Sequence, residues 1–137
     1  EVFPDGLVFG NTHLGAGYDV VLVGQKTPAP IDVDVIQARL SSPAYAHVAY
    51  SLSQIGFTSA VDLLSTFAAR ADQLHPWLDD AQINLDRNLR LQYLAGFGAN
   101  FYEQASIYSG MIRQRRFPEG LFTGSPETIA QLRARFQ

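Results

Sequence analysis

Three histidines are the first residues to test for chemistry, because imidazole can bind a metal ion or move a proton near neutral pH. They are His13, His47 and His75. A metal-binding pair on one helix needs a spacing of three or four residues, and these histidines lie much further apart. The spacing predicts no metal site, and it leaves two interpretations of His13, as a ligand contact or as an ordinary loop residue.

The acidic and hydroxyl side chains have no catalytic spacing either. Asp79 and Asp80 are adjacent, so in a helix they would point about 100° apart and could not face each other as an acid and a base. Ser51, Ser53 and Ser65 lack the G-x-S-x-G context of a strained nucleophile turn. The chain has no cysteine, which excludes a Cys nucleophile, a disulfide framework and a thiolate metal site. We therefore expect no catalytic residue and no metal ligand in this chain.

Glycines surround a loop that could be mistaken for a phosphate-binding loop. Gly10, Gly15 and Gly17 lie between two β-rich runs, residues 7–10 and 18–24. A phosphate loop needs a helix directly after it, so that backbone N–H groups and the helix dipole meet the phosphate. A strand follows here instead. The pattern therefore predicts an antiparallel β-hairpin with a glycine-containing turn.

The second strand of this hairpin carries the most informative pattern in the chain. Residues 20–23 form a continuous apolar run, which is typical of a strand buried on both faces of a helix-covered sheet. Only one such strand is present. We therefore expect the rest of its sheet to come from elsewhere, and the start at Glu1 without a methionine agrees with a segment of a longer protein.

The rest of the chain predicts helices separated by proline and glycine. Helical spacing of apolar residues or capping residues marks four stretches: 32–40, 43–56, 58–68 and 125–136. A longer helix is predicted after Gly98, ending near the arginines at 113–116. Only residues 83–93, with apolar side chains on alternate positions, predict extended chain. The expected division is a terminal β-hairpin at 1–27 and a helical region at 28–137.

Composition and charge restrict the partners of this chain. It has 137 residues, of which 47% are hydrophobic and only 17% charged, so one domain with a partly covered surface is expected. Residues 1–82 hold three basic and nine acidic residues, and residues 83–137 hold seven and four. The basic end suits an acidic surface or solvated helix faces. Its arginines are not interleaved with exposed aromatics, so no nucleic-acid partner is expected, and no apolar run is long enough to span a membrane.

Two segments together resemble spermidine synthases, especially the bacterial spermidine synthase-like proteins fused to a membrane-spanning region. Residues 3–24, F-P-D-G-L-V-F-G-N-T-H-L-G-A-G-Y-D-V-V-L-V-G, are similar to the last sheet hairpin of the methyltransferase-like fold in these proteins. Residues 81–93, A-Q-I-N-L-D-R-N-L-R-L-Q-Y, are similar to their I-N-T-D-D-x-P-x-L-E-[YF] segment. The second match departs from the pattern at Leu85, Arg87 and Leu89.

The resemblance implies the C-terminal portion of an α/β, Rossmann-like fold of the S-adenosylmethionine-dependent methyltransferase type, with a β-hairpin followed by a mostly helical appendage. It implies a cytoplasmic parent protein, or one with a membrane anchor, that transfers an aminopropyl group from decarboxylated S-adenosylmethionine to putrescine or a related amine. This segment alone would bind no cofactor and would not be catalytic. Its partners would be the upstream part of the same protein and, as a second option, another copy of itself.

The same resemblance implies a contact with the small amine substrate. The loop at residues 11–17 corresponds to a P-T-Y-P-x-G loop of related enzymes near the amine pocket. Thr12, His13 and Leu14 are the substrate-binding residues implied, although Leu14 stands where the tyrosine would be. Two alternatives remain: another S-adenosylmethionine-dependent transferase of the same fold, and a non-enzymatic helical interaction domain that carries a β-hairpin.

Overall fold

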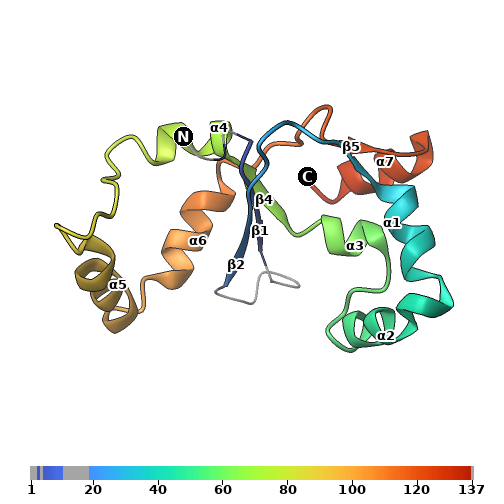
Figure 1. Cartoon of the computed structure of the whole chain (residues 1–137), viewed down its shortest axis with the longest axis horizontal. Coiled ribbons are helices and arrows are strands. Elements are labelled where there is room, and N and C mark those ends of the chain that lie inside the picture. The colour runs from blue at the N-terminus through green and yellow to red at the C-terminus, as the bar shows by residue number, and fades with distance from the viewer. Residues whose placement is uncertain (1–2, 4, 11–18, 137) are drawn as a thin grey trace.

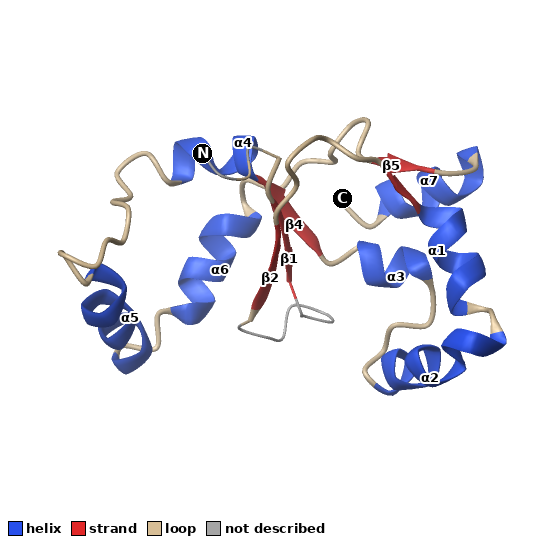
Figure 2. Ribbon diagram, in the orientation of Figure 1, coloured by secondary structure: helices blue, strands red, loops and turns tan. Residues whose placement is uncertain are grey.

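The computed structural model describes residues 3, 5–10 and 19–136 of the chain. A small antiparallel sheet lies in the middle of an elongated molecule, with one group of helices on each side (Figure 1). Strands make up a minor part of the chain and helices the larger part (Figure 2). The expected mixed α/β composition, a hairpin followed by a mostly helical region, is confirmed at this level.

The central sheet has three strands. β1 (Leu7–Gly10) pairs antiparallel with β2 (Val20–Val23), which confirms the hairpin, and its other edge pairs antiparallel with β4 (Phe67–Arg70). The strand order is therefore β2-β1-β4. Residues 67 and 68 were expected on the face of a helix, so β4 is a correction to the sequence analysis. The short helix α3 (Ala60–Leu64) ends before residue 67. Residues 67–70 then pair with the free edge of β1 and form a strand.

Each face of this sheet carries its own hydrophobic core. Leu7 and Phe67 belong to the first core, with α1, α3 and α7, whereas Val8 belongs to the second, with α4 and α6. Alternate side chains of a strand point to opposite faces, so one short strand serves both cores. The pairing of β1 with β4 is irregular between Val8 and Phe9. This β-bulge allows both Ala68 and Ala69 to join the second core.

Three of the helices on the side of the first core, α1, α3 and α7, start at a side-chain cap. The elements are β3 (Ile31–Asp32), α1 (Val33–Leu40), a 3-10 turn (Pro43–Tyr45), α2 (Ala46–Gln54), α3 (Ala60–Leu64), β5 (Phe122–Thr123) and α7 (Pro126–Ala134). β3 and β5 form a separate parallel pair. Asp32 accepts from Val35 N at 3.0 Å and Ser125 accepts from Thr128 N at 3.3 Å, so both predicted starts are confirmed. The cap of α3 is Ser59, one residue after the predicted start of this stretch at Thr58.

The second side of the sheet carries α4 (Ala71–Leu74), a 3-10 turn (His75–Trp77), α5 (Arg90–Asn100) and α6 (Gln104–Ile112). Trp77 packs on the second core. The extended chain predicted for residues 83–93 is wrong from Arg90 onward. The long helix predicted after Gly98 is also wrong, because Tyr102, with a φ of 56°, lies in the break between α5 and α6.

A cluster of phenylalanine rings fastens α7 to the sheet. The ring of Phe67 lies 5.7 Å from those of Phe9 and Phe122 and 5.9 Å from that of Phe136. The guanidinium of Arg115 lies 4.0 Å from the centre of the Phe136 ring and donates to the carbonyl oxygen of Ser65 at 2.9 Å. These contacts join residues that are far apart in the sequence, so Phe67 is the centre of the first core.

We expect Phe67→Ala to destabilise the chain by about 3–5 kcal/mol, because it removes a ring that is 1% exposed and leaves a cavity beneath three other rings. Urea denaturation followed by circular dichroism measures this loss. Tyr50→Ala, on the exposed face of α2, is the control and should change the free energy of unfolding by less than about 0.5 kcal/mol.

Candidate functional site

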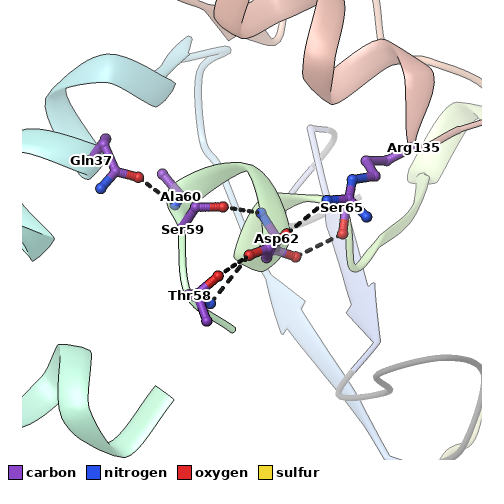
Figure 3. Close-up of polar contacts among 7 residues, drawn as sticks. All are labelled: Gln37, Thr58, Ser59, Ala60, Asp62, Ser65 and Arg135. Carbon is purple, nitrogen blue, oxygen red and sulfur yellow. Dashed lines mark hydrogen bonds and ion pairs between the residues drawn. The ribbon is translucent and has the colours of Figure 1, made fainter. Parts of the chain in front are cut away.

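The polar and titratable side chains of the described residues are mostly separate from one another or bound in structural contacts. Among the residues that the structure describes, no three His, Cys, Asp or Glu side chains come together as metal ligands. His47 and His75 lie exposed on different elements. The most developed polar network instead surrounds Asp62, in the first turn of α3 (Figure 3).

Both carboxylate oxygens of Asp62 have partners. One oxygen accepts from the hydroxyl of Thr58 at 2.8 Å and from its backbone N–H at 3.2 Å, and the other lies 3.1 Å from a guanidinium nitrogen of Arg135. Nearby, Ser59 accepts from the Asp62 N–H, and Gln37 accepts from the Ala60 N–H at 2.8 Å. The network therefore satisfies the first N–H groups of α3 and ties this helix to α1 and to the end of α7. The polar groups of this network are already bound to one another and to backbone N–H groups, so they have a structural role.

The titration of Asp62 agrees with a structural role. Partial burial raises the pKa of this carboxyl, but the hydrogen bonds from Thr58 and Ser59 and the charge of Arg135 outweigh it and hold the pKa below its ordinary value. A catalytic acid would need a raised pKa. Asp62 is ionised at neutral pH and stays bound to its partners.

Asp34 is a second occupied carboxylate. It accepts from the Thr128 hydroxyl at 2.7 Å and from the Ser125 N–H, at the start of α7. These hydrogen bonds lower its pKa, that from Thr128 most. Gly124 has a φ of 152°, and a Cβ there would lie 3.2 Å from the Asp34 carboxylate. Asp34 therefore holds the start of α7 against α1. A small hollow of about 130 Å³ lies at this contact.

A hollow of about 250 Å³ lies at one end of the sheet, and its lining includes Asp5, Gln25, Arg70 and Glu119. Two of these charged residues have partners outside the hollow. Arg70 pairs with Asp72 at 3.3 Å, and Arg133 binds both oxygens of Glu119 at 2.7 and 2.9 Å. The hydrogen bonds from Arg133 hold the pKa of Glu119 below its ordinary value. Arg70 and Glu119 are therefore held in ion pairs at the border of the hollow.

The strand β2 has an unpaired edge and exposed apolar side chains in the described part of the chain. Its four residues pair with β1 on one side only. The exposed fractions of Val20, Val21, Leu22 and Val23 are 42%, 54%, 74% and 38%. β2 is therefore not buried on both faces in this chain, and the expectation that the rest of its sheet comes from elsewhere stays a prediction. Among the described residues, no strand pairs with the outer edge of β2.

An apolar hollow of about 310 Å³ adjoins this strand. Val21 lies opposite Phe9 in the ladder, so both point to the face of the first core. Phe57, Leu63 and Leu64 line the other side of the hollow. The uncovered surface therefore extends from the edge of β2 onto this face of the sheet.

The opposite face of β2 is also uncovered. Leu22 lies opposite Val8, whose side chain belongs to the second core. Leu22 itself is the most exposed residue of the strand. The candidate functional site is therefore a docking edge, defined as Val20–Val23 together with the adjoining apolar hollow.

The three residues that the resemblance places near an amine substrate, Thr12, His13 and Leu14, lie outside the described residues. The sequence pattern at 20–23 did identify the strand that became the docking edge. It missed the apolar hollow, because Phe57 and Leu63 approach Val21 only after α3 packs on the sheet.

Comparison with known proteins finds no matching family model, no similar curated protein and no similar solved structure. Within the described part of the chain, no helix has both the length and the hydrophobicity needed to cross a bilayer.

We expect the free energy of unfolding to fall as the pH drops below about 4, the ordinary pKa of a carboxyl in an unfolded chain. The folded-state pKa values of Asp34, Asp62 and Glu119 are all lowered. Their stabilisation is therefore complete above the unfolded value and is lost as the pH falls through the folded values. Urea denaturation between pH 7 and pH 2.5 measures the dependence.

Asp62→Asn should destabilise the chain by roughly 1–2 kcal/mol at pH 7 and flatten this pH dependence, because it removes charge-assisted hydrogen bonds. Asp79→Asn, at an exposed position, is the matched control and should leave the pH profile unchanged. An Asp62→Asn profile as steep as that of the unmodified chain would contradict the role given to this carboxylate.

Proposed function

We propose that this chain is the C-terminal segment of a spermidine synthase-like aminopropyltransferase, and that its docking edge completes the sheet of the upstream part of the same protein. The observation that carries the proposal is the uncovered strand β2. It supports the two sequence matches at residues 3–24 and 81–93, which imply the final hairpin of a Rossmann-like, methyltransferase-type sheet.

The distribution of apolar side chains on β2 favours an α/β partner. Antiparallel sheets with one solvated face alternate apolar and polar residues, whereas strands inside α/β sheets are apolar on both faces. Val21 and Leu22 point to opposite faces of β2 and are 54% and 74% exposed. Covering both requires a strand along the edge and layers on either side of it. A second sheet stacked on one face would leave the other residue in water.

The total accessible surface supports a large missing contact. The chain exposes 9609 Å², which is about 2,500 Å² more than the roughly 7,100 Å² expected for a compact monomer of 15.1 kDa. A standard-size interface takes about 800 Å² from each partner. The excess is therefore large enough for an extensive interface. Figure 1 shows two helical groups that extend away from the sheet.

In the proposed transferase, the catalytic groups would lie outside this segment. In aminopropyl transfer, an amine nitrogen attacks the carbon next to the sulfonium of decarboxylated S-adenosylmethionine. A C–N bond forms, the C–S bond breaks to leave a neutral thioether, and the nitrogen then loses a proton. The upstream part would bind the donor and take up the proton. This segment would supply the last strands of the sheet and the loop at residues 11–17, with Thr12, His13 and Leu14 near the amine.

Leu22→Lys tests the docking edge. We expect the isolated variant to keep its stability within about 0.5 kcal/mol, because residue 22 is exposed there. Co-expressed with the upstream part of the protein, the variant should no longer co-purify with it, since docking would bury a charge without a partner. Tyr50→Lys, also at an exposed position, is the matched control and should co-purify like the unmodified chain.

The same purified complex tests the reaction. Formation of spermidine from putrescine and decarboxylated S-adenosylmethionine, measured by mass spectrometry, is the expected result. Methyl transfer without aminopropyl transfer would assign the parent to another transferase of the same fold. If Leu22→Lys binds the upstream part as well as the control does, the docking edge is not the interface.

A further inference from the structure

We propose that the docking edge binds its partner by strand addition: a strand of the partner pairs with the backbone groups of Val20 and Leu22, and one large apolar side chain of that strand fills the hollow beside Val21. This inference rests on the proposed function, because it specifies how the upstream part would bind at the docking edge. The two contacts together define the partner segment as extended chain with a bulky apolar residue opposite Val21.

The hydrogen bonds between β1 and β4 show in which direction each residue of β1 turns its backbone. Gly10 donates its N–H to the carbonyl oxygen of Thr66 at 2.8 Å, and the carbonyl oxygen of Gly6 accepts from Ala71 at 2.9 Å. The bulge between these two bonds places its extra residue, Ala68, in β4, so β1 itself is regular. Along a regular strand, successive residues turn their N–H and C=O alternately to the two neighbouring strands. The even-numbered residues of β1 therefore face β4, and the odd-numbered residues face β2.

The same alternation assigns the backbone groups of β2. Leu7 lies opposite Val23 and Phe9 opposite Val21, so these pairs are the hydrogen-bonded positions between β1 and β2. The residues at 20 and 22 then turn their N–H and C=O away from β1, to the open edge. Among the described residues no strand pairs with this edge. It therefore presents two backbone donors and two backbone acceptors in a row.

These groups require a strand as their partner. A helix bonds its own N–H and C=O groups internally, so it could not pair with them, and burial without partners would cost free energy. The edge also lacks the features that protect edge strands from strand addition. Residues 20–23 contain no lysine, proline or charged side chain, and the pairing of β1 with β2 has no bulge. Addition of an extended segment to such an edge is a common mode of peptide recognition.

The hollow of the docking edge suits one large apolar side chain. Its volume is about 310 Å³, and an apolar cavity of about 150 Å³ already accepts a benzene ring. Its lining includes Phe9, Val21, Phe57 and Leu63. Thr66, which also lines it, donates its hydroxyl to the carbonyl oxygen of Leu63 at 2.7 Å. The described side chains of the hollow therefore offer apolar contact and no unpaired polar group.

The geometry of the ladder directs one partner side chain to this hollow. Residues directly opposite each other in a sheet point to the same face, so the partner residue opposite Val21 lies on the face where the hollow opens. Because Val21 turns its backbone to β1, an antiparallel partner would meet it at a non-hydrogen-bonded position, where side chains approach most closely. An aromatic or long aliphatic residue at that position of the partner therefore determines the specificity of the docking edge.

Hydrogen exchange measured by NMR tests the assignment of the backbone groups. In the isolated chain, the amides of Val21 and Val23 should exchange slowly, because they bond to β1, and those of Val20 and Leu22 should exchange rapidly. In the complex with the upstream part, exchange at Val20 and Leu22 should slow by at least about 100-fold. Equal protection of all four amides in the isolated chain, or no gain at Val20 and Leu22 in the complex, would overturn strand addition.

Proline at position 22 separates the backbone contact from the side-chain contact. Leu22→Pro removes an outward N–H, which an edge strand tolerates, so the isolated variant should stay folded by circular dichroism. Leu22→Ala shortens the side chain but keeps the N–H, and it is the matched control. In titration calorimetry with the upstream part, Leu22→Pro should raise the Kd at least about tenfold above that of Leu22→Ala, because a buried acceptor of the partner loses its donor. Val20→Pro repeats the test one outward position away.

Leu63→Trp tests the hollow. The indole would occupy the space that the partner side chain needs, so the Kd should rise at least about tenfold. Val21→Trp, which fills the hollow from a position that is 54% exposed, should have the same effect. Leu78→Trp, at an exposed position after the turn His75–Trp77, is the matched control and should leave the Kd unchanged. If both tryptophans in the hollow bind like this control, the hollow receives no partner side chain.

The variants at position 22 distinguish a failure of strand addition from a failure of the proposed function. If Leu22→Lys no longer co-purifies while Leu22→Pro binds as tightly as Leu22→Ala, the docking edge is the interface but strand addition is overturned. If Leu22→Lys co-purifies like Tyr50→Lys, the docking edge is not the interface, and strand addition fails with it.

Discussion

β1 is the strand on which the rest of the molecule depends, because it is the only one with a neighbour on both edges in the described sheet. Its alternating side chains enter two different cores, Leu7 in one and Val8 in the other. Four residues thereby join helical groups that otherwise lie on opposite sides of the molecule. The same geometry forces β2 to an edge, where its backbone groups and its apolar side chains meet no partner on the outer side.

This constraint explains the uneven quality of packing in the chain. Around Phe67 the contacts are dense, and Arg115 and Arg133 cover the outer rings of the cluster. The carboxylates of Asp34 and Asp62 fasten α7, α1 and α3 to one another. Away from these contacts, β2, α2 and α5 expose apolar side chains. The well-packed part supports these exposed surfaces, which could bind other proteins.

The proposed function assigns the docking edge to a partner on physical grounds. A strand with an open edge and apolar residues on both faces requires another strand with flanking layers, which the upstream part of a methyltransferase-type sheet would provide. The described chain would supply binding surface, and the catalytic groups of the proposed transferase would come from outside it.

Several features followed from the sequence because they depend on neighbouring residues alone. The hairpin at β1 and β2 and the caps at Asp32 and Ser125 are of this kind. Local hydrogen bonds and side-chain alternation determine such features. The apolar run at Val20–Val23 likewise predicted a strand that needs partners, although its burial could not be read from the pattern, since burial depends on what surrounds the strand.

Only the tertiary structure decided the features that depend on distant contacts. Residues 67–70 form a strand because β1 has a free edge there, which overrides their helical spacing. Residues 90–100 are helical because Asn84 and Asn88 close the preceding loop, although the apolar residues alternate as in a strand. Leu63 and Phe57 meet Val21 only when α3 lies on the sheet. The sequence by itself therefore determined which segments carry apolar surface, and the fold decided which of those surfaces remain uncovered.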